Sequence, residues 1–241
     1  MRSLLIACLG LSLAACNMVV TETPMFTAAD QTGATPREGI WLSADADCAV
    51  DVAKKADAWP ECADWFVYRQ GRMEFPNEKP DLPFSGPVPV VVAGGSPQVW
   101  QMTLELPAKA GEPKSRMSLY AGFEPLERDG QGRVTRYRSW PALCGPPPPP
   151  EEEKKAAAAA PPAPRSGKAS DKNVPGASGE ASADELKLPD LMTKAPFPGL
   201  TLMGKAGCKP DDEAALRNAV AASRAFAEEH EEIRWVRERY P

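Results

Sequence analysis

Four cysteines beyond residue 40 are the residues of this sequence whose type and spacing best suit covalent chemistry. Cys48, Cys62, Cys144 and Cys208 form an even set, which in an exported chain indicates two disulfides with three formal connectivities. We favour Cys48–Cys62, because these two are close in the sequence, and Cys144–Cys208, because this pair brackets a segment of different composition. Closing loops of these lengths stabilises a fold by about 3 to 4 kcal/mol if chain entropy dominates.

The same residues give less support to a metal site or a catalytic site than to disulfides. The cysteine spacings match no zinc motif and contain no C-x-x-C pair, so we expect neither a metal site nor thiol redox chemistry. The chain has one histidine, His230, which lies at helical spacing from Phe226 and Ile233 and is interpreted as part of an apolar helix face. No G-x-S-x-G sequence offers a nucleophile. We therefore expect no catalytic residues, no cofactor and no enzyme; a hydrolase of wall or sugar polymers using paired carboxylates is the less favoured alternative.

The start of the chain has the pattern of an export signal. Met1-Arg2-Ser3 carries one positive charge, and the apolar run from Leu4 to Ala15 is shorter than the about 20 residues of a transmembrane helix. Leu13-Ala14-Ala15-Cys16 resembles the lipobox of bacterial lipoproteins. The resemblance implies cleavage before Cys16, a diacylglyceryl thioether on its thiol, and acylation of the new amine, for example by palmitate. A chain held by several acyl groups binds a membrane firmly.

The residue after the lipobox bears on the destination. Asn17 stands where the enteric sorting pattern of lipoproteins has an Asp for retention in the inner membrane. The resemblance therefore implies the outer membrane of a Gram-negative bacterium, with the chain facing the periplasm. Beyond Cys16 no apolar stretch is long enough to span a bilayer, so we expect the lipid to be the membrane anchor.

Composition narrows the range of partners and divides the chain. The formal net charge of −5, without clustered Lys and Arg, argues against nucleic acid and against a polybasic membrane contact. The 27 prolines are unevenly placed, and residues 145–197 differ in composition from the rest: they open with Pro146–Pro150 and continue in Ala, Glu, Lys and Ser. Such a segment buries too little apolar surface to offset the entropy of ordering it, so we expect a disordered insertion.

The expected organisation follows from this division. Residues 1–15 are the signal peptide and residues 16–37, which lack periodicity, a lipidated tether. Residues 38–144 and 198–241 form one domain of strands and a helix, held by the disulfides, and residues 145–197 interrupt it. A domain of this size is large enough to bury a core.

Short strands separated by turn residues fill the first folded piece. Alternation of apolar and polar residues is clearest in Gln98–Leu106 and recurs in residues 117–123. Gln70-Gly71 and Asp129–Gly132 are turn sequences between apolar runs. The other expected strands are Gly39–Leu42, Trp65–Arg69, Arg72–Phe75, Val88–Ala93, Val134–Trp140 and one within Gly199–Gly204.

The C-terminus changes to helical spacing. Asp211 is the expected N-cap, and apolar residues at intervals of three and four continue from Leu216 through His230 to Ile233. Strands followed by one helix predict a mainly β fold with one C-terminal helix, as a small antiparallel barrel or bent sheet.

Two family resemblances bear on function. The folded part is similar to small lipoproteins of Gram-negative envelopes, which implies a structural or binding role there, with an envelope protein or peptidoglycan as partner. Gly39-Ile40-Trp41 resembles the G-x-W of lipocalins, which implies, as the alternative, a barrel that carries a small apolar ligand. The residues that would line such a cavity are Trp41, Trp65, Trp100, Met102, Leu104, Leu119 and Phe123.

Overall fold

The computed structural model describes residues 17–44, 48–75, 86–106, 115–147, 193, 195–204, 207–226 and 231–238. The predicted signal peptide, Cys16, His230 and residues 148–192 of the predicted insertion lie outside the described residues.

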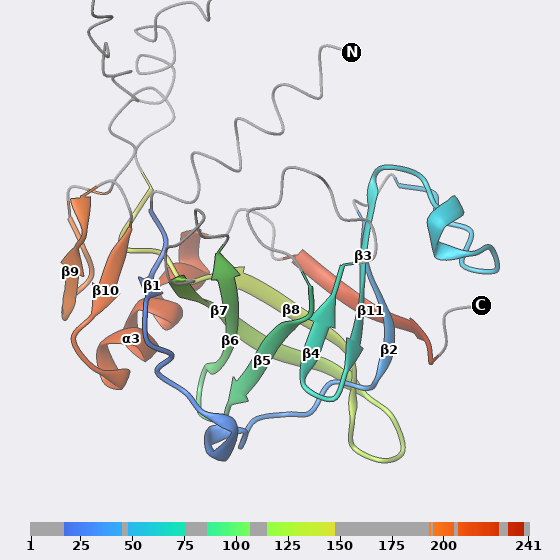
Figure 1. Ribbon diagram of the computed structural model, residues 1–241, viewed down its shortest axis with the longest axis horizontal. Helices are drawn as coiled ribbons and strands as arrows, with labels where there is room; N and C mark the ends of the chain where they lie inside the picture. Colours follow the sequence, from blue (N-terminus) through green and yellow to red (C-terminus); the bar gives the residue numbers. More distant parts are fainter. Residues whose placement is uncertain are drawn as a thin grey trace, which may run out of the picture. The chain divides into compact units, whose positions relative to one another are not determined.

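Eight antiparallel strands of the described chain close into a barrel, which confirms the expected mainly β fold (Figure 1). They follow one another around the barrel in chain order, and the last pairs with both β8 and β2 to close it. The strands are β2 (Gly39–Ala44), β3 (Ala63–Arg69), β4 (Arg72–Glu74), β5 (Val88–Ala93), β6 (Gln98–Leu106), β7 (Ser115–Arg128), β8 (Val134–Pro141) and β11 (Glu231–Arg237). Each strand expected before the insertion is present.

Alternation of side chains along the strands separates the barrel interior from its outer surface. Trp100 of β6 lies opposite Ala121 of β7, and both belong to the interior cluster of apolar side chains. Their neighbours Val99 and Tyr120 face outward into a second cluster. Both faces of β6 and β7 are therefore buried, which a period-two pattern alone does not indicate.

The turn between β3 and β4 has the geometry that its sequence favours. Gln70 and Gly71 both have positive φ, 49° and 69°, as a two-residue type I′ hairpin requires. Gly71 adopts this conformation without steric cost, because it has no Cβ. Beyond this turn β5 loses β4 as a neighbour: the N–H of Val90 donates to the carbonyl of Gly71, and the rest of β5 needs other partners.

Residues 17–38 supply those partners, and the tether predicted over residues 16–37 is wrong for the described part. We call residues 17–38 the N-terminal strap. It begins beside β8, forms β1 (Val20–Thr21) against β7, passes through the 3₁₀ helix η2 (Ala28–Asp30) and enters β2. Val19 is fully buried and Phe26 nearly so. Sequence periodicity missed the strap because its apolar residues are irregularly spaced.

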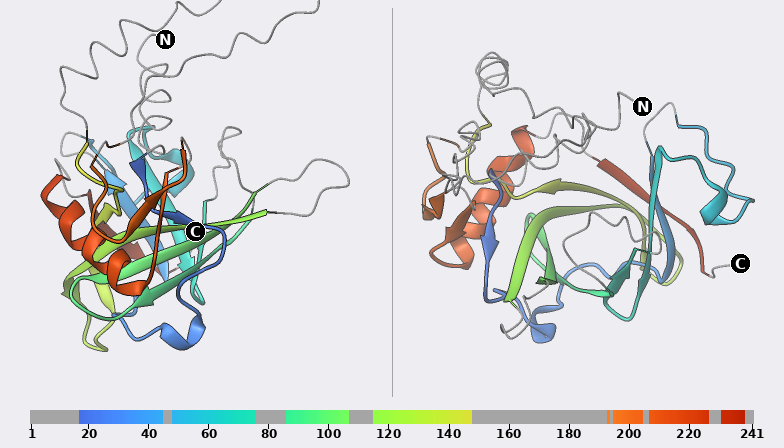
Figure 2. Two further views of the ribbon diagram at one scale, coloured as in Figure 1. Left: turned by 90° about the vertical axis from the view of Figure 1, so that its left-hand side faces the viewer. Right: turned by 45° about the horizontal axis from the view of Figure 1, so that its top comes forward.

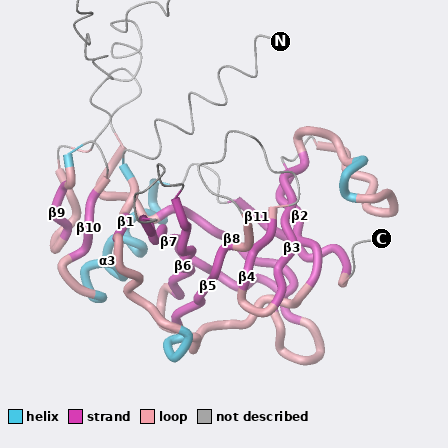
Figure 3. Tube along the Cα trace, viewed as in Figure 1, coloured by secondary structure: helices cyan, strands magenta, loops and turns pink. Residues whose placement is uncertain are grey.

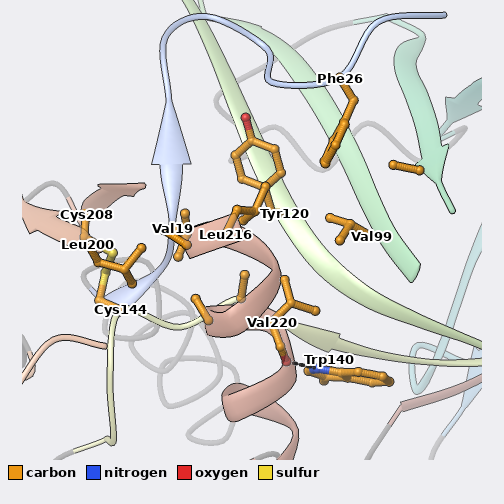
Figure 4. Packing of buried hydrophobic residues seen from close by; sticks show 14 residues of the cluster. Val19, Phe26, Val99, Tyr120, Trp140, Cys144, Leu200, Cys208, Leu216 and Val220 are labelled. Atoms are coloured by element: carbon orange, nitrogen blue, oxygen red, sulfur yellow. Dashed lines mark hydrogen bonds between the residues drawn. A yellow bond between two sulfur atoms is a disulfide. The ribbon is translucent and has the colours of Figure 1, made fainter. Parts of the chain in front are cut away.

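An outer layer covers β7 and β8 on one side of the barrel (Figure 2). It consists of β1, the hairpin of β9 (Leu200–Leu202) and β10 (Cys208–Pro210), and helix α3 (Glu213–Ser223). The indole N–H of Trp140 donates to the carbonyl of Val220 in α3 over 2.8 Å, and both residues lie within the cluster drawn in Figure 4. A methyl group at Gly122 would overlap the Trp140 ring, so glycine there allows this close packing.

The expected C-terminal helix is present but shorter than predicted (Figure 3). Its N-cap is Asp212, whose side chain accepts from the Ala215 N–H, and not Asp211. The helix ends at Ser223 with the 3₁₀ turn η5 (Arg224–Phe226), and Ile233 lies in β11. The spacing that extended the helix to Ile233 is misleading, because in β11 Ile233 faces the barrel interior. Strand pairing with β2 and β8 overrides local helical preference here.

Both disulfides favoured on sequence grounds are present, Cys48–Cys62 and Cys144–Cys208. The first closes the excursion between β2 and β3, which carries the 3₁₀ helix η3 (Ala56–Ala58) and packs Trp59 onto the outer surface of the barrel. The second joins the end of β8 to β10, and both of its cysteines are fully buried. None of the helices among the described residues has the length and apolar character needed to cross a bilayer.

Candidate binding groove

A groove of about 920 Å³ runs along the outer surface of the barrel beside the N-terminal strap. This volume falls within the roughly 300–1,000 Å³ typical of ligand sites. We call it the strap groove. Its floor comes from both faces of β5, including Val88 and Val90 of the interior cluster, and from outward-facing residues of β6. Its walls come from the strap and the β3–β4 turn. The lining includes Phe26, Gln31, Glu38, Tyr68, Pro87, Pro89, Val91, Gln101, Thr103, Glu105 and Arg116.

Side-chain amides hold the strap in place along the groove. The Gln101 amide accepts from the Phe26 N–H over 2.9 Å and donates to the Phe26 carbonyl over 2.8 Å. The Gln98 side chain accepts from the Ala34 N–H over 2.7 Å, and the Gln31 side chain from the Val92 N–H over 2.8 Å. A glutamine amide offers both a donor and an acceptor, so it substitutes for a neighbouring strand. These contacts leave no pattern in the sequence, because glutamine on an outward strand position usually faces solvent.

The lining of the groove is mixed in chemistry. Pro87, which precedes β5, and Pro89 of β5 are exposed, and Val91 is half-buried. Thr103 of β6 adds a polar group to the lining, and its hydroxyl oxygen lies 3.1 Å from that of Ser118. Proline at the outward position 89 is compatible with the sheet because β5 lies next to the short strand β4. The groove therefore combines flat apolar surface with neutral hydrogen-bonding groups.

The charges in the groove are locally balanced. Glu105 forms an ion pair with Arg116 across the β6–β7 pair, with 3.4 Å between oxygen and nitrogen. Glu38 accepts a hydrogen bond from the Gln70 N–H over 3.0 Å. Neither carboxylate is held in a way that points to acid–base chemistry. Among the described residues no group of three or more His, Cys, Asp or Glu side chains is arranged to hold a metal ion.

Tyr68 links the groove to the barrel interior. It lines the groove, is only 4% exposed, and its ring lies 6.2 Å from that of Trp100 in the interior. Burial disfavours the charged phenolate, and the negative charge of Glu38 disfavours it further, so the pKa of Tyr68 is raised to about 12. The hydroxyl therefore stays protonated at physiological pH and offers a hydrogen bond rather than a charge.

Six of the seven residues predicted to line a cavity share the interior cluster. Trp41, Trp100, Met102, Leu104, Leu119 and Phe123 lie there, whereas the assignment of Trp65 to this lining is wrong. Trp65 points to the outer surface of β3, where its ring packs 6.1 Å from Trp59. Since neighbouring residues of a strand face opposite sides, Phe66 takes the inward position. Ligand binding by the six stays a prediction.

Aromatic rings occupy the middle of the interior. The Tyr137 ring lies 5.2 Å from Trp41, 5.4 Å from Trp100 and 4.7 Å from Phe123. Trp41 also stacks on Phe66 at 6.4 Å. Such contacts stabilise a packed core beyond the effect of burial alone. The indole N–H of Trp41 donates to the Arg37 carbonyl over 2.9 Å, so this core is fixed to the strap as well.

A ladder of alternating charges connects β7, β8, β11 and η5 on the outer surface. Glu232 of β11 lies 2.7 Å from Arg138 and 3.7 Å from Arg136 of β8. The Arg138 hydrogen bond is the main cause that holds the pKa of the Glu232 carboxyl below its ordinary value. The ladder continues through Glu124 to Arg224 at 2.8 Å. It attaches the closing strand to its neighbour, and its exposure limits each pair to a modest contribution.

Cys16, the predicted lipidation site, lies outside the described residues, but the residue that follows it is described. Asn17 is 5% exposed, and its side-chain amide donates to the Gly145 carbonyl over 3.1 Å. Comparisons of the sequence with family models and with curated proteins, and of the fold with solved structures, give no match.

Removing the Tyr68 hydroxyl should remove the part of the alkaline pH dependence of stability that comes from Tyr68. The folded state keeps the Tyr68 proton up to a pKa of about 12, whereas the unfolded chain loses it near the ordinary value of 10.0. Tyr68 therefore contributes stability that is complete below the unfolded pKa and is lost as pH rises through the folded pKa, by about 3 kcal/mol. We expect the free energy of unfolding of Tyr68→Phe to fall less steeply over this range than that of the wild type.

Tyrosinate absorbance provides the direct measurement. The titration curve of the wild type minus that of Tyr68→Phe should have its midpoint at about 12. A midpoint near the ordinary tyrosine value would show that Tyr68 is solvated and would contradict its burial between groove and interior.

Proposed function

We propose that this chain is a lipid-anchored protein of the Gram-negative outer membrane that faces the periplasm and binds an envelope partner in the strap groove. The lipobox-like Leu13–Cys16 supports the anchor, and Asn17 supports the outer membrane. Two disulfides are in keeping with an oxidising compartment such as the periplasm.

The strap groove is the observation that carries the binding role. It lies beside a segment that begins one residue after the proposed anchor and is fastened to the barrel by Gln101 and Gln98. A groove whose wall is fixed in this way is preorganised, which lowers the entropic cost of binding. Among its polar groups, Gln101 and Gln31 are hydrogen-bonded to neighbouring backbone, and Glu105 is ion-paired with Arg116.

An extended polypeptide segment of an envelope protein is the partner that the lining favours. Pro87, Pro89 and Val91 offer apolar surface along one strand, and Thr103 offers a hydroxyl beside it. Peptides bound in extended conformation use this combination of apolar contacts and regularly spaced hydrogen bonds. Peptidoglycan is the competing occupant, because its sugars and short peptides present similar polar groups.

A carrier of a small apolar ligand is the second candidate. The closed barrel of eight antiparallel strands favours it, since barrels of this size can hold one small ligand. The aromatic cluster around Tyr137 opposes it, because these rings occupy the space that a ligand would need. Tyr68 and Val90, which belong to the interior cluster and also line the groove, are the route by which the interior would be reached.

The anchor is tested by replacing Cys16 with serine, which keeps the side chain small but cannot form the thioether. The wild type should fractionate with the outer membrane, and its mature N-terminal peptide should begin at Cys16 with the mass of diacylglycerol and an amide-linked acyl chain. Cys16→Ser should lose the lipid, remain unprocessed before residue 16 and leave the outer-membrane fraction. An unchanged mature N-terminus and unchanged fractionation in the variant would refute the lipid anchor.

The groove is tested by placing a photo-reactive amino acid at Pro89 in intact cells. Illumination should give a discrete crosslinked product, and the additional substitution Val91→Arg, which puts a charge into the groove, should remove it. The same amino acid at the exposed Gln131, in the β7–β8 turn, is the matched control. Mass spectrometry of the product distinguishes a protein from a glycan. Identical products from positions 89 and 131 would show that the groove has no specific partner.

A further inference from the structure

The first described residues lie at a corner of the molecule where several chain segments meet. Residues 17–19 pair with residues 142–145: the Cys144 N–H donates to the Asn17 carbonyl and the Val19 N–H to the Ala142 carbonyl, each over 2.8 Å. On the other side the Cys208 N–H donates to the Met18 carbonyl over 3.2 Å. The Cys144–Cys208 disulfide joins the two flanking segments (Figure 4). We call this region, residues 17–18, 143–147, 193, 195–197, 202–204 and 207, the anchor corner.

The chain has no slack between this corner and the proposed lipid. Asn17 is 5% exposed and hydrogen-bonded through both its backbone and its side chain. Cys16 is the next residue, and one residue spans at most about 3.6 Å. The polar zone on each side of a bilayer is only about 5 to 8 Å thick. Lipid on Cys16 therefore brings the anchor corner to the membrane surface.

The described side chains at the anchor corner suit a lipid surface. None of them is ionisable, although charged residues make up 25% of the whole chain. Leu202 of β9 is 39% exposed and lies opposite Cys208 in the β9–β10 pair. Phe226, 37% exposed, borders the corner through its ring contact with Phe197, whose N–H donates to the Cys144 carbonyl.

Two of the three large apolar residues that are exposed in the described chain, Leu202 and Phe226, thus lie in or beside the same corner. Each is tied to a segment that holds Asn17 or Met18: Leu202 lies opposite Cys208 in the β9–β10 pair, and the ring of Phe226 lies 6.3 Å from that of Phe197.

We infer that the anchor corner is a second membrane contact, in which Leu202 and Phe226 enter the lipid interface beside the acylated Cys16 and fix the orientation of the barrel. The inference rests on the proposed lipidation. In Figure 1 the anchor corner lies at the upper side of the barrel, whereas η2 and the β3–β4 turn lie at the lower side. The orientation directs the strap side of the groove away from the bilayer, towards the periplasm.

The test uses the full lipidated chain in vesicles of phosphatidylethanolamine and phosphatidylglycerol. A photo-reactive amino acid is placed at Leu202, and in separate proteins at Phe226 and at the control position Gln131, which is exposed in the β7–β8 turn. This turn lies at the lower side in Figure 1. After illumination, mass spectrometry measures phospholipid adducts and, in the same sample, the lipid on the Cys16 peptide. Two corner positions are used so that a fault in one variant does not decide the result.

Phospholipid adducts at positions 202 and 226, with none at 131, are expected. Absence of adducts at both corner positions, or equal labelling at 131, in protein whose Cys16 peptide carries lipid would overturn the membrane contact and leave the anchor intact. A Cys16 peptide without lipid would instead overturn the proposed anchor and this inference with it.

Discussion

The backbone of residues 22–35, between β1 and the bridge of Pro36 to Val134, has to find its hydrogen bonds largely outside regular strand pairing. Buried N–H and carbonyl groups that stay unpaired are costly, so a segment of this kind packs against a barrel only if other groups satisfy it. Gln101 does so at Phe26 with two bonds, and Gln98 does so at Ala34. These amides hold the strap in position. The strap in turn forms the wall of the groove and covers the part of β5 that lies beyond the β3–β4 turn.

The same constraint separates what the sequence predicts from what it does not. Alternation along Gln98–Leu106 predicts β6 to the residue, and the pairing of Cys144 with Cys208 follows from the segment that they bracket. Contacts at long range are different. The strap is irregular in sequence, and β11 carries helical spacing, so only their partners on the folded barrel determine their conformation. Trp65 shows how far alternation can predict side-chain direction within a strand. Alternation places Trp65 and its neighbour Phe66 on different faces of β3 but does not say which face is inside.

Anchor, groove and interior are connected through the strap. Its first residue is packed beside the Cys144–Cys208 disulfide, its middle walls the groove at Phe26, and its end receives the Trp41 indole at the Arg37 carbonyl. A lipid on the residue before the strap would therefore hold the whole barrel in one orientation, whereas a flexible linker would let the barrel rotate. The proposed groove function and the proposed membrane contact both follow from this rigidity, and neither requires a catalytic group.

Native-state hydrogen exchange of the strap tests this account most directly. Amide protons of Val19, Phe26 and Gly33, which are hydrogen-bonded to Ala142, Gln101 and Val92, should exchange as slowly as those in the centre of β6. Such protection means that the strap opens only when the barrel does. Fast exchange of these three amides, with β6 still protected, would show a loose tether before the barrel, and it would contradict both the fixed groove wall and the fixed orientation at the membrane.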